Sequence, residues 1–460
     1  MRTLFAKHVA VPLKSLLKRE PSRKVSLELE RLQWLTPEAL HQERTRLLRE
    51  LLVAVGRDVP FYRDRVRELG ADPGHDDPWT ILRGLPLMDK KLYRDLGPAL
   101  ASEHPKHHPV VSHTSGTTGE RLEIRVDPLA AAYMYLGGYR GRRWWGIEQG
   151  DPEFKVWGSG SQTERTAMGR GKGALKAVKE WTMGVTLVSP FFRTDEDLDQ
   201  AVAQLFRRKP VFVFGYANSL ALLAAHMVRR GLTAGPGWPK VVAYTSEMLS
   251  EAKRETLRTA FAAPVISEYG SCEGGVMAWE CPKGTLHTCD DVSALEILDA
   301  AASPVPAGTV GELVVTNLRA HEFPLIRYRQ GDLASLGEAG CACGRGLGSL
   351  KSLVGRMNDV LLSPSGASID FIVFDKVMKD QPAIRRFKVV ERAEGELVVL
   401  CELHPGETWA DADRERLLEQ CHRLLPDDVH LTARVADRLP PEPSGKFRVM
   451  IRRADAARYL

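Results

Sequence analysis

Short apolar runs alternate with helix-like segments through the middle of the chain, and this alternation constrains the fold more than any other feature. Strands are predicted at 211–215, at 240–244 and from 265 onward, and helices at 219–230 and 250–261. Strands separated by helices favour parallel pairing, with the helices packed on the sheet. The sequence therefore predicts an α/β fold built on mixed or parallel sheets.

The length of the chain calls for more than one domain. A single hydrophobic core rarely grows beyond about 250–300 residues, and this chain has 460. The composition changes near Gly355, after which the pattern is typical of a small α+β unit. We predict a large N-terminal domain over 1–355 and a small C-terminal domain over 356–460. The elements expected in the small domain are strands at 387–390, 396–403 and 430–435 and a helix at 411–425.

Helices are expected in the first 70 residues of the large domain, with breaks near Pro37 and Pro60, and further strands are expected at 311–316 and 325–328. The first 24 residues mix basic and apolar side chains. Such a segment suits either an anionic membrane surface or packing on the protein itself. Both alternatives stay open from the sequence.

Charge and hydropathy exclude several classes of protein. The net charge is only +5 and is spread over the whole chain, so there is no footprint for nucleic acid. No apolar run approaches the roughly 20 residues of a membrane-spanning helix, and the N-terminus lacks the apolar core of a secretion signal. We expect a cytoplasmic protein with small-molecule partners, and the sequence leaves a homodimer open.

A run of hydroxyls and glycines follows the apolar pair at 110–111 and indicates a phosphate-binding loop. Glycine brings backbone N–H groups close to an anion, and hydroxyls add donors at short reach. An ordinary polar turn is the alternative, and a Walker-type loop is unlikely because no Gly-Lys-Ser/Thr follows. The predicted phosphate-binding residues are Thr114, Ser115, Gly116, Thr117, Thr118 and Gly119.

Six polar segments occur in a fixed order: 114–119, 244–247, 268–273, 327–332, 355–359 and 443–448. This order and spacing resembles the acyl-adenylate-forming enzymes over nearly the whole chain. Within them it is most similar to the phenylacetate–CoA ligase branch and its CapK-type relatives. The resemblance implies activation of a carboxylic acid with ATP to an acyl-AMP, release of pyrophosphate, and transfer of the acyl group to a thiol, with coenzyme A the expected acceptor.

The resemblance also implies roles for individual residues. Lys446, on a mobile small domain, would bridge the carboxylate and the α-phosphate, and Glu273 would hold Mg²⁺. Asp332 would accept hydrogen bonds from the ribose hydroxyls, with help from Arg356. Asn358 would be the hinge between the domains. The residues expected to flank the base are Ser246, Glu247, Tyr269 and Gly270.

The chain departs from the family pattern at three places. Glu120 and Arg121 follow the glycine-rich loop where Lys is usual, and Cys272 stands where Ser or Thr is usual. A thiol is a weaker hydrogen-bond donor than a hydroxyl. Asn358 replaces the usual hinge residue, and Asn tolerates unusual backbone angles. These departures bear on rate and nucleotide contacts rather than on the type of reaction.

Three cysteines and a histidine suggest a structural zinc site. Cys281 and His287 form one pair, Cys341 and Cys343 form another, and both pairs lie in segments that contain glycine. Three thiolates and an imidazole suit a closed tetrahedral site with no position left for catalysis. Similar sets in relatives support this interpretation. The alternative is four unrelated residues, with Cys341 and Cys343 as a reactive pair.

The chemical class of the acid substrate is indicated by aromatic side chains alone. The segments that build the acid pocket in the family suit a flat aryl or arylacetyl acid, although aromatic residues are as often plain core. Two other functions stay open: transfer of the acyl group to an amine, a sugar or a carrier protein, and a catalytically degenerate scaffold stabilised by zinc. The candidate pocket residues are Tyr135, Tyr139, Trp157, Tyr216 and Tyr244.

Overall fold

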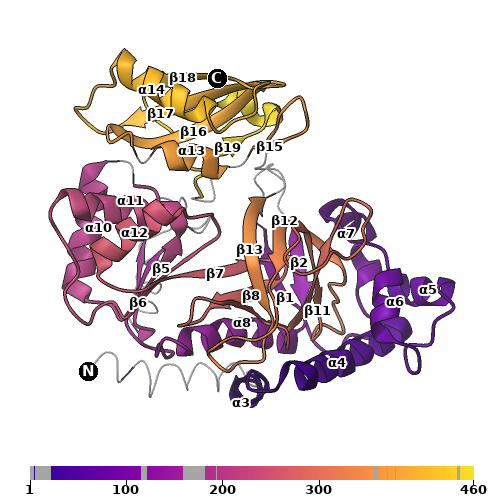
Figure 1. Cartoon of the computed structure of the whole chain (residues 1–460). Helices are drawn as coiled ribbons and strands as arrows, with labels where there is room; N and C mark the ends of the chain where they lie inside the picture. Colours follow the sequence, from indigo (N-terminus) through magenta and orange to yellow (C-terminus); the bar gives the residue numbers. More distant parts are fainter. Residues whose placement is uncertain are drawn as a thin grey trace, which may run out of the picture.

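Two separate sheets organise the chain (Figure 1). An eleven-stranded sheet has the order β10-β11-β12-β13-β9-β8-β7-β6-β5-β3-β4, and a four-stranded sheet has the order β18-β17-β16-β19. We call the residues up to 356 the large domain and those from 361 the small domain. The α/β prediction is confirmed, while the boundary between 355 and 356 stays a prediction. The computed structural model describes residues 5, 22–114, 122–158, 182–192, 194–356, 361–369, 371–378, 380–442 and 446–460.

The large domain carries most of the helices. Its α-helices are α3 (Ser22–Leu32), α4 (Pro37–Asp58), α5 (Pro60–Glu68), α6 (Pro78–Gly84), α7 (Lys90–Leu96), α8 (Pro128–Arg143), α10 (Asp195–Arg208), α11 (Ala217–Arg229) and α12 (Glu251–Phe261), with the 3-10 helix η2 (Gly97–Leu100). Its strands are β1 (Val110–His113), β2 (Glu123–Val126), β3 (Glu153–Val156), β4 (Val185–Val188), β5 (Phe212–Tyr216), β6 (Val241–Thr245), β7 (Val265–Ser271), β8 (Gly275–Glu280), β9 (Leu286–Thr288), β10 (Ser293–Leu298), β11 (Gly311–Asn317), β12 (Tyr328–Leu336) and β13 (Ser349–Arg356).

The small domain follows the large one and contains both kinds of element. Its elements are β14 (Leu361–Leu362), β15 (Ser368–Ile369), α13 (Phe371–Met378), β16 (Ile384–Ala393), β17 (Glu396–Leu403), α14 (Asp411–His422), β18 (His430–Val435), β19 (Met450–Ile451) and the 3-10 helix η5 (Arg453–Arg458). Its core residues come from both helices and the sheet, for example Phe374, Val389, Val399 and Leu417. The small domain therefore has a core of its own.

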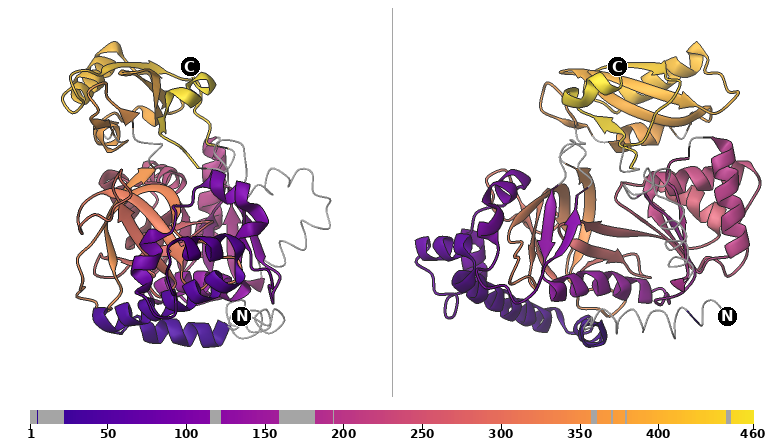
Figure 2. Two further views of the ribbon diagram at one scale, coloured as in Figure 1. Left: turned by 90° about the vertical axis from the view of Figure 1, so that its right-hand side faces the viewer. Right: turned by 180° about the vertical axis from the view of Figure 1, so that it is seen from behind.

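The large sheet changes character along its width. From β4 to β7 neighbouring strands are parallel, and from β7 to β10 they are antiparallel. Helices α10, α11 and α12 lie together beside the parallel strands (Figures 1 and 2) and share one apolar cluster with β3, β5 and β6. Because the carboxyl ends of these strands meet at one edge, the loops after β5, β6 and β7 lie together.

Glycines allow α8 to pack directly on the sheet. A Cβ atom at Gly141 would lie 2.2 Å from the Trp279 ring, and one at Gly138 would lie 3.0 Å from the Val276 side chain. Any larger residue would push the helix away. The indole of Trp279 is fully buried, so this close approach closes the core on the side of the sheet opposite α11 and α12.

Proline begins helices in the N-terminal region where the sequence indicated breaks. Pro37 is the first residue of α4, and the Thr36 hydroxyl accepts the N–H of Ala39 as the cap. Pro60 begins α5 directly after α4. Proline lacks an N–H, which the first helical turn does not need. The predicted breaks are therefore helix starts, and α4 and α5 share one apolar cluster with the antiparallel half of the sheet.

The strand predicted over 325–328 begins only at Tyr328. Arg327 has a φ of 48°, and its guanidinium donates at 2.8 Å to the carbonyls of both Arg83 and Leu85. These bonds turn the chain toward the N-terminal helices before the strand starts. The local apolar pattern could not reveal partners so distant in the sequence.

Within the part of the chain that the structure describes, every helix is too short or too polar to cross a bilayer.

Candidate active site and metal centre

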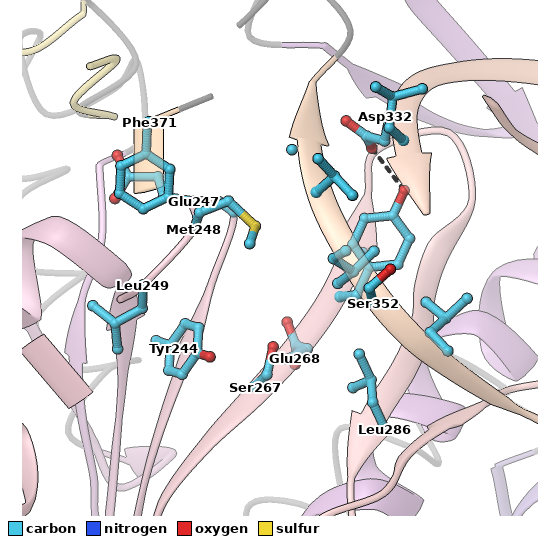
Figure 3. A pocket seen from close by; sticks show the side chains of 18 of the residues that line it. Tyr244, Glu247, Met248, Leu249, Ser267, Glu268, Leu286, Asp332, Ser352 and Phe371 are labelled. Atoms are coloured by element: carbon cyan, nitrogen blue, oxygen red, sulfur yellow. Dashed lines mark hydrogen bonds between the residues drawn. The ribbon is translucent and has the colours of Figure 1, made fainter. Parts of the chain in front are cut away.

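A cavity of about 1060 Å³ lies between the two domains. It is walled by the ends of β6 and β7, by β12 and β13, and by residues of the small domain, with apolar side chains such as Met248, Leu249 and Phe371 beside polar ones (Figure 3). Sequence-predicted residues that line it are Tyr244, Ser246, Glu247, Tyr269, Gly270, Asp332 and Lys446.

Two of these residues are directly bonded. The Tyr269 hydroxyl donates to Asp332 Oδ2 at 2.6 Å (Figure 3). Asp332 lies opposite Arg356 in the ladder between β12 and β13. Bonding to a charged acceptor is stronger than bonding between neutral groups, so the phenol and the carboxylate hold each other at one wall of the cavity.

The turn after β6 brings its backbone to the cavity. Ser246 has a φ of 72°, which is uncommon for a residue other than glycine and costs of order 1 kcal/mol. The next residue, Glu247, accepts the backbone N–H of Asn218 at 2.9 Å and that of Phe447. Burial raises the pKa of Glu247, although these two N–H groups and the charge of Lys446 act to lower it.

Asn218 and Phe447 were not singled out from the sequence. Asn218 lies in the first turn of α11 and Phe447 follows Lys446. Both act through contacts that join the two domains, and no local pattern marks such contacts. The sequence feature that pointed to such contacts was the acidic residue at 247, because a half-buried carboxylate requires hydrogen-bond donors.

The predicted phosphate loop is described only at its start. Thr114 exchanges hydrogen bonds with Leu122: its N–H donates to the carbonyl at 3.0 Å, and its hydroxyl accepts the N–H at 3.1 Å. These bonds close a loop whose residues 115–121, including Ser115, Gly116, Thr117, Thr118 and Gly119, lie outside the described residues. The predicted hinge Asn358 lies outside them as well.

The acidic segment after β7 lies against the start of that loop. The Cys272 thiol is 3.6 Å from the carbonyl oxygen of His113, at the end of β1. Glu273 is buried, with 7% of its surface exposed, and accepts the Tyr328 hydroxyl at 3.3 Å. The predicted metal-binding carboxylate therefore follows directly after a residue that contacts the end of β1.

Four of the predicted pocket aromatics form two pairs on the α8 side of the sheet. The ring centroids of Tyr135 and Tyr139 are 5.0 Å apart, and those of Trp157 and Tyr216 are 4.4 Å apart. Tyr244 belongs instead to the cluster with α10–α12, because successive residues of a strand face opposite sides. Tyr244 thus lies on the other face of the sheet from these four and lines the interdomain cavity instead.

Charged groups accompany the aromatic pairs. Arg142 forms an ion pair with Glu153 at 3.2 Å, and the Lys155 ammonium lies 4.7 Å above the Trp157 ring. Burial lowers the pKa of Lys155 and raises that of Glu268. Half-buried charges among aromatic rings are more typical of a binding site than of a plain core.

The Cys/His cluster comprises Cys281, His287, Cys341 and Cys343, whose ligand atoms all lie within 4.8 Å of one another. Cys281 follows β8, His287 lies on β9, and the two other cysteines precede β13. All four belong to the large domain. The structure thus gathers residues that are about 60 positions apart in the chain.

The Cys/His cluster fits a tetrahedral zinc ion. Two Zn–S bonds of about 2.3 Å place their sulfurs about 3.8 Å apart, and Cys281 and Cys341 have that separation, 3.8 Å. His287 Nδ1 lies 3.1 Å from the Gly348 carbonyl oxygen, so Nε2 faces Cys343 at 3.2 Å. Burial raises the pKa of Cys341, but hydrogen bonds with Thr285 and Cys343 outweigh it and lower this pKa to about 6. A thiolate is the form that binds metal.

Comparison with known proteins adds independent evidence, although no family model matches the sequence. The phenylacetate-coenzyme A ligase of Thermus thermophilus is 26% identical over 439 residues, 88% of this chain and 92% of the relative. Protein CapK of Staphylococcus aureus is 25% identical over 178 residues, 38% of each chain.

Solved structures share the fold. The crystal structure of 2-hydroxyisobutyryl-CoA ligase in its postadenylation state has a TM-score of 0.70 and 18% identity, with 88% of each chain covered. The chain is therefore similar over most of its length to phenylacetate-coenzyme A ligases, and it shares its fold with 2-hydroxyisobutyryl-CoA ligase. The same ligase in its thioesterification state gives a TM-score of 0.58 over 92% of each chain. The arrangement of the two domains is therefore nearer to that in the first of these two structures.

Proposed function

We propose that the chain activates a carboxylic acid with ATP to an acyl-AMP and then transfers the acyl group to coenzyme A. The observation that carries the proposal is the cavity between the domains. It combines an acid and a phenol of the large domain, Asp332 and Tyr269, with a lysine of the small domain, Lys446. Relatives named as phenylacetate-coenzyme A ligases, at 26% identity over most of their length, support the same reaction.

The chemistry has two steps. A carboxylate oxygen of the acid attacks the α-phosphorus of ATP, and the bond from that phosphorus to the bridging oxygen breaks, so that pyrophosphate leaves. The thiol of coenzyme A then loses its proton and attacks the acyl carbon, and AMP leaves. The first step brings two anions together, so it needs a cation between them.

We assign that cation to Lys446. A fixed charge at a developing anion contributes about 2.7–4 kcal/mol to catalysis. Asp332 would accept the ribose hydroxyls, and Tyr269 would hold Asp332 in place through the 2.6 Å bond while its ring flanks the base. The sharp turn at Ser246 would present backbone groups to the base.

Glu273 is the proposed Mg²⁺ ligand. Its carboxylate is a hard oxygen donor, it is buried, and it follows Cys272, which contacts the end of β1. When bound, Mg²⁺ would neutralise charge on the phosphate oxygens. Tyr328 donates to one oxygen of Glu273 and so orients the carboxylate.

The Cys/His cluster is the proposed zinc site, and its role is structural. Four protein ligands complete the coordination of the ion, so no position is left for a substrate. When bound, zinc would tie the turn between β8 and β9 to the loop before β13. The packing of Trp144 against His287, with ring centroids 5.8 Å apart, supports the same part of the large domain.

The proposed substrate is an aryl or arylacetyl acid. The aromatic pairs beside β3 and β5 offer flat walls, and Lys155 adds a cation at one side. Acceptor-specific experiments then decide between coenzyme A and other acceptors.

The test is acid-dependent exchange of labelled pyrophosphate into ATP, across phenylacetate, benzoate, 2-hydroxyisobutyrate and longer aliphatic acids. We expect exchange with the aromatic acids and thioester formation after coenzyme A is added. Exchange followed by product formation only with amines or sugars would replace the second step, and absence of exchange with every acid would overturn the first.

A further inference from the structure

The residue next to Lys446 is bound by the large domain through its backbone. The Phe447 N–H donates to Glu247 Oε1, and the Phe447 carbonyl accepts Asn218 Nδ2 at 3.4 Å. The second oxygen of the Glu247 carboxylate accepts the Asn218 backbone N–H at 2.9 Å. Glu247 and Asn218 thus form a receptor for both backbone polar groups of one residue, which we call the Phe447 receptor.

The Phe447 receptor is itself anchored in the large domain. Glu247 follows the turn at Ser246, and its carboxylate lies at the first turn of α11, where free N–H groups favour an anion. Lys253 on α12 donates to Asn218 Oδ1 at 3.3 Å. The two side chains are therefore oriented before the small domain contacts them.

The segment that carries Lys446 is also held firmly within the small domain. The Val389 N–H donates to the Val449 carbonyl at 2.8 Å, and β19 continues the chain as a strand parallel to β16. The fully buried Lys388 donates to the Arg448 carbonyl at 2.6 Å, with its ammonium 4.2 Å from the Phe447 ring. The segment therefore moves with the small domain as one body.

Lys446 also has a backbone contact of its own with the small domain. The Glu442 N–H donates to the Lys446 carbonyl at 2.8 Å. Other contacts between the domains are farther along the chain from Lys446: Lys253 with Asp375 at 2.6 Å, and the Arg386 guanidinium with the Phe192 carbonyl at 2.9 Å. The contact at Phe447 is one residue from the ammonium that the reaction needs.

We propose that Glu247 and Asn218 are positioning residues for the first half-reaction. They bind the backbone N–H and carbonyl of Phe447 and so fix Lys446 at the cavity, and the same bonds break when the small domain turns for the transfer to the thiol. The inference rests on the proposed function. It agrees with a TM-score of 0.70 to the postadenylation state of 2-hydroxyisobutyryl-CoA ligase against 0.58 to its thioesterification state.

The two half-reactions separate a positioning role from a structural one. Adenylation is measured by pyrophosphate exchange at saturating ATP, and thioester formation is measured from presynthesised acyl-AMP and coenzyme A. We expect E247A to lower the kcat of exchange at least tenfold, E247Q to lower it less because one acceptor oxygen is kept, and N218A to lower it a few-fold. Thioester formation should be unchanged or faster.

The matched control is E255A, an exposed glutamate of α12 that pairs with Arg258 on the surface, and it should leave both rates unchanged. Equal losses in both half-reactions would overturn the proposal. A higher KM for ATP at unchanged kcat in E247A would also overturn it, because that result indicates contact with the nucleotide rather than placement of Lys446.

A readout without activity keeps the proposal distinct from the proposed function. Hydrogen exchange of the peptide 446–451 should show the Phe447 amide protected in the wild type and exchanging at least tenfold faster in E247A and E247Q, with β16 and β17 as an unchanged internal reference. Unchanged protection in both variants would overturn the proposal, even if no acid supports pyrophosphate exchange. Should E247A not fold, E247Q and N218A give the same comparison.

Discussion

The Cys/His cluster and the interdomain cavity both gather polar residues from distant parts of the chain, but they are built differently. The ligand atoms of the Cys/His cluster lie within 4.8 Å of one another and all come from the large domain. The cavity takes Asp332 and Tyr269 from one domain and Lys446 from the other. The Cys/His cluster, which is expected to be static, thus lies within one domain. Lys446, which is expected to leave the cavity between the two half-reactions, is on the other domain.

The difference separates stability from chemistry. A closed metal site stabilises the fold that contains it and leaves no position for a substrate. In the proposed mechanism, the lysine on the second domain contributes little to either core but decides whether two anions can meet. Substitutions in the Cys/His cluster should therefore lower stability more than catalytic rate, and substitutions at the cavity should lower catalytic rate more than stability.

The largest effect is expected for Lys446→Ala. Loss of the bridging cation should lower the rate of pyrophosphate exchange by about 100- to 1000-fold, equivalent to about 2.7–4 kcal/mol. The midpoint of thermal unfolding should not change, because Lys446 is only half-buried. The control is Lys376→Ala on the exposed side of α13. Exchange within threefold of the wild type would remove Lys446 from the mechanism.

The next effect is expected for Cys343→Ser, and it should appear in stability rather than in chemistry. Zinc measured by atomic absorption should fall from one ion per chain to a small fraction. The free energy of unfolding should drop by more than about 2 kcal/mol, a shift of several degrees in Tm. Pyrophosphate exchange at low temperature should stay within a few-fold. Cys272→Ser, outside the Cys/His cluster, should keep its zinc; equal metal content in both variants would contradict the site.

A smaller effect on chemistry is expected for Asp332→Asn. The substitution removes a charged acceptor that Tyr269 bonds at 2.6 Å, and a bond of this kind contributes about 1.5–3 kcal/mol. The value of kcat/KM for ATP should fall about tenfold or more, and Tyr269→Phe should lower it less. Asp95→Asn, an exposed residue of α7, is the control. An unchanged kcat/KM for ATP would exclude Asp332 from the nucleotide site.

The smallest effect concerns Lys388, whose ammonium donates to the Arg448 carbonyl in the segment that carries Lys446. Burial lowers the pKa of Lys388 to about 8, whereas in the unfolded chain it is about 10.4. Above pH 8 the folded state loses the proton while the unfolded state keeps it, so stability rises with pH. Relative to Lys388→Met, the wild type should gain about 1 kcal/mol of unfolding free energy between pH 8 and pH 9. Urea unfolding of both proteins measures the difference, and a flat difference would contradict the buried charge.

Much of the fold was visible in the sequence because its signals are local. Apolar runs at 211–215, 240–244 and 311–316 correspond to β5, β6 and β11 within one or two residues. The helix predicted at 250–261 is α12, which begins after its cap at Ser250. The order of polar segments indicated the resemblance to acyl-adenylate-forming enzymes, and the similarity to phenylacetate-coenzyme A ligases agrees with it.

Other features could not be predicted because they depend on partners far away in the chain. The strand at 325–328 is delayed to Tyr328 by the bonds of Arg327 to two carbonyls of the N-terminal region. Tyr244 was grouped with Trp157 and Tyr216, but the alternation of β6 places it on the other face. A face depends on where a strand begins in its sheet, and the apolar pattern of a fully buried strand does not mark that position.

The sequence by itself determined the class of fold, the resemblance to acyl-adenylate-forming enzymes and the set of residues that form the Cys/His cluster, because residue type and spacing carry that information. The tertiary structure alone decided which side chains meet. It joined the Glu247 carboxylate, which the sequence places at the base, to the backbone N–H of Phe447 in the other domain. The physical reason is that a buried carboxylate takes whichever donors the packing brings to it, and packing between two domains leaves no periodic trace in either segment.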